Sequence, residues 1–540
     1  MPAPIERDIL HIDGRSVHVR QCGAGPPLVL LHQSPKTSAE LTDRLEAWAD
    51  KFWCLAPDHP GYGLSDPLPA RAPSIDDLAA AHMALADALG LDRLLVYGFH
   101  TGAKIALAMA ALYPDRIAGA VANGVLVNSP GDRQSLLQHY LPAFEAQADG
   151  SHLAGLWHRV QDQRIFFPWY DRRDATRLPM APGDPETLQA SAMDILAAGD
   201  AYRAGYGAAL AVDSRAVLAR LRTPTLVTGG PGDVLSAGLK ALDTSDHVHV
   251  AAADSDAELD RQVIAFLHQH APAAGEPRRP QIAGSPRLRP TLYRAGDRHL
   301  HGLAGGDGPI TLVLPAPGGS VFELERMLQP LTRRHHILAL DPPGHGWSDG
   351  DAPHWADALV DGLNAAAPTT IVAQGLGLAF VRALLAAGMT PPQRLVALDT
   401  VFDRDRPPAA LLPDLTPDRG GGHLLAAWHA IRLGRLFFPW TDPRPETAIP
   451  SDGRLVTFDL HAATVALLNG WRAGRRLLGA HADLAQWTPE AVPQRIALCP
   501  AWAEARSDVT PPPAGWHRQW VDPADRGPAL ESALSAAAAP

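Results

Sequence analysis

The sequence predicts an α/β protein with two doubly wound, mostly parallel sheets, each carrying an inserted helical cap. Three observations support this fold class. Short apolar runs of strand length alternate with helical patterns, the whole pattern occurs twice in 540 residues, and a long, mostly helical stretch interrupts each copy. Alternating strands and helices favour a parallel sheet covered by helices on both faces. A chain of this length also exceeds what one hydrophobic core usually accommodates.

Motifs of the first half return in the second half in the same order. The segment 164–171 (RIFFPWYD) returns as 435–442 (RLFFPWTD), and the segment 150–153 (GSHL) returns as 421–424 (GGHL). Both repeats have an offset of 271 residues, the difference between the residue numbers of their first positions. Because the repeated unit is the size of a whole domain, the pattern indicates a duplicated domain and not a solenoid of short repeats.

The repeat divides the chain into two domains joined by a linker. We expect one domain over residues 1–271, with a cap at about 126–220, and a second over residues 291–540, with a cap at about 401–490. The linker is expected at residues 272–290, because that stretch is rich in proline and has no apolar period.

Composition argues against several classes of function. The net charge is −11, the sequence pI is about 6.1, and no long basic run occurs, so nucleic acid is not an expected partner. The first residues lack a signal-peptide pattern and no stretch has the uncharged length that spans a bilayer, so we expect a cytoplasmic protein without a membrane partner. Cys22, Cys54 and Cys499 lie scattered in or beside apolar stretches and give no framework for disulfides.

The segment that most directly indicates a catalytic site is the pentapeptide 98–102, which reads Gly-Phe-His-Thr-Gly. An apolar strand at 94–97 precedes it and a helical pattern at 103–112 follows it. Strand, sharp turn and helix are the context of a G-x-S-x-G nucleophile elbow, in which a serine stands at the turn. His100 occupies that serine position, so the sequence keeps the frame of a catalytic site and replaces its usual nucleophile.

With these motifs the first half resembles the α/β-hydrolase superfamily. Residues 30–33 (LLHQ) match the oxyanion loop, residues 58–66 (DHPGYGLSD) match the turn after the next strand, and residues 98–102 match the elbow. The strand at 224–227, followed by Asp233, resembles the strand and acid that close the active site. The resemblance implies the α/β-hydrolase fold but no single reaction, because this scaffold carries esterases, lactonases, dehalogenases, lyases and inactive proteins.

The resemblance also implies a serine, a histidine late in the domain, an acid, and two backbone N–H groups that hold the oxyanion. The late histidine is missing as well, since residues 252–256, after the predicted strand 247–251, contain none. His247 and His249 precede that position, within the strand itself. A Ser-His-Asp triad is therefore excluded.

The absence of the elbow serine and the absence of the late histidine are explained together if His100 reaches the retained acid, Asp233. An imidazole extends farther from its Cα than a hydroxyl does, so His100 and Asp233 are predicted to form a dyad. Such an imidazole can serve as a general base or as a nucleophile, because the pKa of a free imidazole side chain lies near neutrality. The oxyanion donors would be the backbone N–H groups of Gln33 and Thr101. The alternative is a non-catalytic binding or scaffold protein that kept the fold.

Side chains of the oxyanion loop and of the cap are the candidates for lining a substrate pocket. His152 and Arg159 are seven residues apart and share one helical face. The aromatic run 166–170 fits a packed hinge as well as a ligand pocket. The predicted substrate-binding residues are His32, His152, His158, Arg164, Phe167, Trp169, Tyr202 and Tyr206.

The second half repeats the motifs of the first half but keeps fewer of the residues that could act in catalysis. Gly375 stands at its nucleophile position, and prolines in segment 314–319 remove N–H donors from the counterpart of the oxyanion loop. Glu504 or Asp508 could stand at the acid position and His517 at the late histidine, but neither acts without a nucleophile. We expect a structural or regulatory domain that packs on the first half as in a homodimer, with further oligomerisation left open.

The sequence therefore predicts a cofactor-free, hydrolase-like or lyase-like enzyme. Its expected partner is a small-molecule substrate with an ester, lactone or other carbonyl group, and its expected catalytic residues are His100 and Asp233. Histidine pairs such as His247 with His249 lack a third ligand at recognisable spacing, so no metal is expected.

Overall fold

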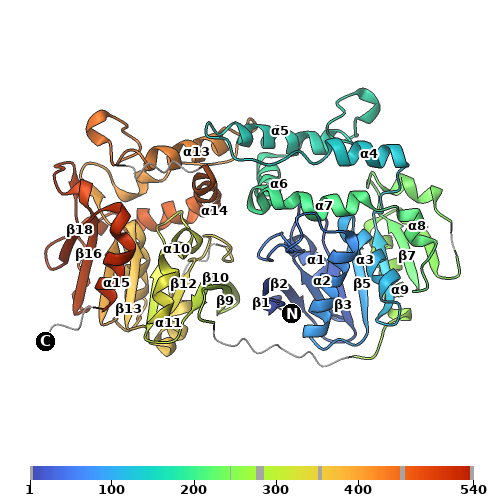
Figure 1. The fold of residues 1–540 in the computed structure, drawn as a ribbon, viewed down its shortest axis with the longest axis horizontal. Helices are drawn as coiled ribbons and strands as arrows, with labels where there is room; N and C mark the ends of the chain where they lie inside the picture. Colours follow the sequence, from blue (N-terminus) through green and yellow to red (C-terminus); the bar gives the residue numbers. More distant parts are fainter. Residues whose placement is uncertain (1–3, 244, 275–284, 351–354, 451–456, 536–540) are drawn as a thin grey trace. The chain divides into compact units, whose positions relative to one another are not determined.

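The computed structural model describes residues 4–243, 245–274, 285–350, 355–450 and 457–535. It consists of two compact units (Figure 1). One comprises the described residues of Met1–Glu145 and Gly155–Ile282, and the other comprises those of Ala146–Ala154 and Ala283–Pro540. Much of the linker expected at 272–290 falls on residues 275–284, which lie outside the described residues.

The first unit is built on an eight-stranded sheet. Its strands are β1 (Glu6–Ile12), β2 (Arg15–Cys22), β3 (Pro27–Leu31), β4 (Trp53–Pro57), β5 (Leu94–Phe99), β6 (Ile117–Asn123), β7 (Thr225–Gly229) and β8 (Val248–Ala252). They are ordered β1-β2-β4-β3-β5-β6-β7-β8. The β1–β2 and β2–β4 pairs are antiparallel, and the other neighbours are parallel.

Helices cover both faces of this sheet. They are α1 (Thr42–Trp48), α2 (Ile75–Ala88), α3 (Thr101–Leu112) and α9 (Asp256–Gln269). Val29 of β3 packs in one apolar cluster with α2 and α3, while its neighbour Leu30 packs in another with α1 and α9. This division follows from strand geometry, because successive side chains point to opposite faces. Strands buried on both faces read as continuous apolar runs.

The second unit has a sheet of the same plan. Its strands are β9 (Arg289–Ala295), β10 (Arg298–Gly305), β11 (Ile310–Leu314), β12 (His336–Leu340), β13 (Thr370–Gln374), β14 (Arg394–Leu398), β16 (Gln494–Pro500) and β18 (His517–Val521). From β9 the order is β9-β10-β12-β11-β13-β14-β16-β18, which matches the first sheet position by position. A separate antiparallel ribbon joins β15 (Phe402–Asp403) to β17 (Val509–Thr510). The shared order agrees with the sequence repeat.

The second sheet is also covered by helices on both faces. They are α10 (Glu325–Leu328), α11 (Trp355–Ala366), α12 (Leu378–Ala386) and α15 (Arg526–Ser535). Leu312 of β11 packs with α11 and α12, and the adjacent Val313 packs with α10 and α15. The prediction of two doubly wound, mostly parallel sheets is confirmed.

A helical insertion interrupts each sheet at the same point of the strand order. Between β6 and β7 lie α4 (Pro130–His139), α5 (Ser151–Ile165), α6 (Pro185–Ala198), α7 (Tyr202–Ala211) and α8 (Ser214–Leu218). Between β14 and β16 lie α13 (Gly422–Gly434) and α14 (Thr457–Ala480). In the first unit α7 contacts α2 and α3, which places this cap against two helices that cover the sheet (Figure 1). No helix within the described ranges is long and apolar enough to cross a membrane.

Candidate active site

His100 stands at a sharp turn between β5 and α3. Its backbone has φ 49° and ψ −103°, a region that residues other than glycine rarely adopt. The flanking glycines are sterically required, since a Cβ on Gly98 would lie 2.0 Å from the Gly102 carbonyl oxygen and one on Gly102 would lie 2.1 Å from that of Leu31. The His100 backbone N–H donates to the Asn123 carbonyl at 2.9 Å and ties the turn to β6.

The His100 imidazole contacts Asp233, which follows β7. Nε2 lies 3.2 Å from Oδ2. Burial raises the pKa of Asp233, but the hydrogen bond and charge of His100 and the N–H of Leu235 outweigh it, and the pKa falls below its usual value. A carboxylate only accepts hydrogen bonds, so Nε2 carries a proton, and in the neutral form of the ring Nδ1 keeps the lone pair. The Phe99 ring stacks on the imidazole with centroids 4.0 Å apart.

Gly124, directly after β6, makes room for this pair. Its φ is 69°. A Cβ there would lie 2.4 Å from Cδ2 of His100 and 2.6 Å from Oδ2 of Asp233. A side chain at this position would therefore displace the imidazole or the carboxylate.

The imidazole faces a cavity of about 280 Å³ in the first unit. Apolar side chains make much of the wall: Leu126, Leu136, Tyr140, Val160, Phe167, Ile195, Ala209, Leu210, Val234 and Leu235. Polar side chains contribute the rest: Gln33, Ser34, Lys36, His100, Thr101, Lys104, Gln163, Arg164, Ser191 and Tyr206. An apolar cavity with a few convergent polar groups is typical of a small-molecule site.

The two predicted oxyanion donors are in different states. Thr101 lines the cavity as the first residue of α3, where a backbone N–H has no intrahelical acceptor and the helix dipole is positive. Gln33 also lines the cavity, but its backbone N–H donates to Oε2 of Glu40 at 3.1 Å, and its side-chain amide donates to Oε1. Burial raises the pKa of Glu40 although both bonds from Gln33 oppose the rise. The Glu40 carboxylate thus accepts the hydrogen bond of the Gln33 backbone N–H, the group predicted to hold the oxyanion.

Three of the predicted substrate-binding residues line the cavity, and two more support the cap instead. Those that line it are Arg164, Phe167 and Tyr206. Trp169 and Tyr202 hold the buried Arg159, whose guanidinium carbon lies 5.3 Å and 4.8 Å from their ring centroids. Arg159 also donates to the Tyr202 hydroxyl at 2.8 Å. These two aromatic residues are therefore packing partners of an arginine and do not belong to the cavity wall.

The three predicted histidines of the pocket lie elsewhere. His158 is exposed on α5. His152 belongs to the second unit, where its ring contacts Trp428 with centroids 4.9 Å apart. His32 is completely buried and stacks on His59 with centroids 3.8 Å apart. A helical face identified from spacing does not reveal which element packs against it.

His32 instead belongs to a buried histidine cluster under the oxyanion loop. Its Nε2 accepts the His59 backbone N–H at 2.9 Å, and the His59 ring contacts His82 through Nδ1 and Nε2 at 2.8 Å. His59 Nε2 lies 2.7 Å from the His32 carbonyl oxygen, so this nitrogen donates and Nδ1 accepts from His82. Burial lowers the pKa of all three imidazoles, that of His82 to about 3. The cluster is neutral and holds the loop in place.

The second unit keeps the positive-φ turn, and its long helix packs closely on the neighbouring loop. Gly375 has φ 53°, and its carbonyl accepts the Thr400 hydroxyl at 2.9 Å. Helix α14 packs on the counterpart of the oxyanion loop through Gly470 and Gly474. A Cβ on either glycine would lie 3.1 Å or 3.0 Å from Gly318 backbone atoms. The glycines thus allow α14 to pack closely on this loop.

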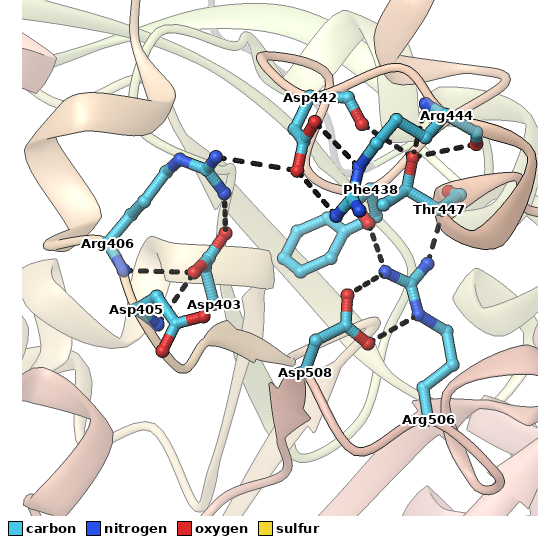
Figure 2. Close-up of polar contacts among 9 residues, drawn as sticks. All are labelled: Asp403, Asp405, Arg406, Phe438, Asp442, Arg444, Thr447, Arg506 and Asp508. Carbon is cyan, nitrogen blue, oxygen red and sulfur yellow. Dashed lines mark hydrogen bonds and ion pairs between the residues drawn. The ribbon is translucent and has the colours of Figure 1, made fainter.

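Asp508, one of the two candidate acids of the second unit, is part of an ion-pair network. Figure 2 shows Asp508 held by Arg506, which also donates to the carbonyls of Phe438 and Thr447. Next to them Arg406 bridges Asp403 and Asp442. Glu504 and His517 are exposed. The network ties the cap of this unit to the loop after β16.

Glu40, Lys104 and Gly124 are among the site residues that the sequence interpretation missed. Lys104 lies one helical turn after His100 and lines the cavity. The chain has only four lysines, which could have drawn attention to it. Within the described residues, no group of three or more histidine, cysteine, aspartate or glutamate side chains is arranged to hold a metal ion.

Comparison with known proteins supports the fold. Residues 26–155 match the family model described as alpha/beta hydrolase fold. The chain has the alpha/beta hydrolase fold. A stretch of 105 residues is 38% identical to haloalkane dehalogenase 2 of Mycobacterium tuberculosis, covering 19% of this chain and 37% of that protein. A stretch of 124 residues is 34% identical to cis-3-alkyl-4-alkyloxetan-2-one decarboxylase of Shewanella oneidensis, covering 21% of this chain and 37% of that protein.

The likeness to these relatives of the alpha/beta hydrolase fold is partial. The chain spans about 37% of the length of the two curated relatives named here. Among solved structures, epoxide hydrolase A from Mycobacterium thermoresistibile is 18% identical, with a TM-score of 0.38, over 49% of this chain and 98% of that chain.

Proposed function

We propose that the first unit is a hydrolase-like enzyme that cleaves an ester or lactone with His100 as its general base. The observation that carries this proposal is the 3.2 Å contact between His100 Nε2 and Asp233 Oδ2 beside the apolar cavity. A carboxylate that fixes the proton on one ring nitrogen leaves the other nitrogen basic. The two relatives that match part of this chain are named as enzymes, which supports a catalytic function for this fold.

The reaction uses water as the nucleophile. Nδ1 of His100 takes a proton from water while the water oxygen bonds to the substrate carbonyl carbon, and Asp233 stabilises the imidazolium that forms. The tetrahedral intermediate then breaks its C–O bond to the leaving alcohol, which receives the proton from Nδ1. An ester yields an acid and an alcohol, a lactone yields one hydroxy acid, and the imidazole returns to its neutral form.

Charge on the intermediate is stabilised by the Thr101 N–H at the start of α3. The second donor of this fold, the N–H of Gln33, is engaged by Glu40. We therefore expect slow turnover unless the substrate displaces that carboxylate. In an alternative mechanism, Nδ1 of His100 attacks the substrate carbonyl directly and forms an acyl-imidazole. Rapid-quench mass spectrometry would detect this acyl group on the peptide that contains His100.

A panel of p-nitrophenyl esters and lactones tests the proposal. His100→Gln removes the base and is expected to lower kcat by about 10²–10⁴-fold on every compound that turns over. His158→Gln is the matched control, because it changes an exposed histidine of the same unit outside the cavity. Equal activity of His100→Gln and the wild type would exclude the catalytic role.

A non-catalytic binding protein is the second candidate, and the Glu40 carboxylate on the Gln33 N–H favours it. It predicts that no member of the panel turns over, and that the wild type and His100→Gln bind small apolar compounds equally in calorimetry.

A further inference from the structure

Lysine is rare in this chain, yet it is concentrated at the cavity. The sequence has four lysines among 47 lysines and arginines. Two of them, Lys36 and Lys104, line the cavity that contains His100. Arginine serves as the cation at nearly every other position, so these two ammonium groups are exceptions, and both lie at the cavity beside His100.

The two lysines differ in how their charge is compensated. The ammonium of Lys36 lies 2.7 Å from the Asp194 carboxylate and 3.3 Å from the Ser191 hydroxyl. The ammonium of Lys104 donates to the carbonyl oxygen of Val212 at 3.3 Å, and no carboxylate of the described residues forms an ion pair with it. Lys36 is thus neutralised within the protein, and Lys104 is not.

Lys104 is also the more deeply buried of the two, with 3% of its surface exposed. A buried charge without a counter-charge is costly, and proteins normally pair it. Burial, with the charge of Arg133, lowers the pKa of Lys104 to about 8 while the charge of Asp213 opposes the shift. Asp213 itself is paired with Arg133 at 3.0 Å. At pH 7 Lys104 remains largely protonated and lacks a strong anionic partner.

We propose that Lys104 binds a carboxylate of the substrate while the reacting carbonyl of the same molecule lies at His100. This deepens the proposed function and rests on it. The substrate class is then an ester or lactone with an apolar body and a separate carboxylate. His100 and Lys104 are four residues apart at the start of α3, a rise of about 6 Å along the helix axis, and both line the same cavity.

Calorimetry with two unreactive probes, hexanoate and hexanamide, tests the anion site without turnover. They share the alkyl chain and differ in the charge of the head group. Wild type is expected to bind hexanoate about 10–100-fold more tightly than hexanamide at pH 7, the range of one hydrogen bond to a charged group. Lys104→Met should reduce the preference to within about twofold. Lys240→Met, which removes an exposed lysine outside the cavity, should keep it.

A second measurement needs only the wild type and decides the matter if Lys104→Met does not fold. Cyanate carbamylates deprotonated amines, and the four lysines are separated by peptide mass spectrometry. Hexanoate should protect Lys104 from carbamylation and hexanamide should not. No preference for hexanoate in the wild type, a preference that survives in Lys104→Met, or no protection of Lys104 would each overturn the proposal.

Matched esters separate this proposal from the hydrolase proposal. The p-nitrophenyl monoester of glutaric acid carries a carboxylate, and its methyl-capped form does not. Hexanoate bound through Lys104 with no ester hydrolysed would refute hydrolysis and leave the anion site standing. Hydrolysis of both esters with equal KM would support the reaction and refute the role of Lys104.

Discussion

His100 and Asp233 are 133 residues apart in the chain, and their side chains meet at 3.2 Å. In a serine enzyme of this fold a third residue, the late histidine, stands between nucleophile and acid. Here the imidazole at the turn contacts the acid directly, with no third residue between them. The arrangement brings the proposed base and the carboxylate that would orient it together, and under this proposal water or substrate is the group to be activated.

Gly124→Ala should separate the pair without changing either member. The new Cβ would meet His100 and Asp233 at under 3 Å, so one of them must move. We expect kcat to fall by about tenfold or more, since misplaced catalytic groups lose rate steeply. Gly14→Ala is the control, because Gly14 also has a positive φ but open space around its Cβ position. An equal loss in both variants would assign the effect to backbone strain.

Asp233→Asn should reduce turnover by about 10²–10⁴-fold while the cavity keeps its shape. The amide has nearly the same size but neither fixes the proton on Nε2 nor stabilises the imidazolium. Ligand binding measured by calorimetry should be nearly unchanged. Asp115→Asn, at an exposed position before β6, is the matched control. Full activity of Asp233→Asn would mean that the carboxylate contact has no catalytic consequence.

Glu40→Ala should raise kcat. Removal of the carboxylate releases the Gln33 N–H as a second oxyanion donor, and one such donor is worth about 10²–10³-fold at most. Glu40→Gln retains an acceptor at this place and should remain close to the wild type. Steady-state kinetics on the best ester decide the question. A folded Glu40→Ala protein with lower activity would place Glu40 in the machinery instead.

The buried histidine cluster predicts a loss of stability in acid. The pKa values of His32, His59 and His82 are lowered in the folded protein, so the unfolded chain binds more protons below about pH 6.5. Their contribution is complete above that pH and declines as the pH falls towards the folded pKa, which for His82 is about 3.

The contribution of His82 can be isolated with His82→Gln, which keeps a donor but does not titrate. Between pH 6 and pH 4 the free energy of unfolding of this variant should fall less steeply than that of the wild type, by about 1.4 kcal/mol per pH unit. Urea denaturation at several pH values measures this difference. His158→Gln should follow the wild-type slope, and identical slopes in all three proteins would contradict a neutral, buried His82.

Much of the fold was predictable because it depends on local patterns. The apolar strand expected at 94–97 lies within β5, and the helical pattern at 103–112 lies within α3 and ends at the same residue. The elbow was predictable because glycines at 98 and 102 have a steric reason that leaves a sequence signature.

The candidate site was less predictable because its contacts are tertiary. Nothing in the spacing of His152 indicated that segment 146–154 packs with the second unit. Trp169 and Tyr202 looked like pocket residues but pack around Arg159. Glu40 carries no motif, and its bond to Gln33 depends on how the loop folds back on the following 3₁₀ turn.

The most direct test of the central claim uses His100→Gly with added imidazole. Glycine suits the positive φ at this turn, as Gly375 does in the second unit, and it leaves a space beside Asp233 that free imidazole can occupy. If His100 is the base, the variant loses ester hydrolysis and millimolar imidazole restores part of it, but not when Asp233→Asn is also present. Undiminished hydrolysis by His100→Gly without imidazole would contradict the claim.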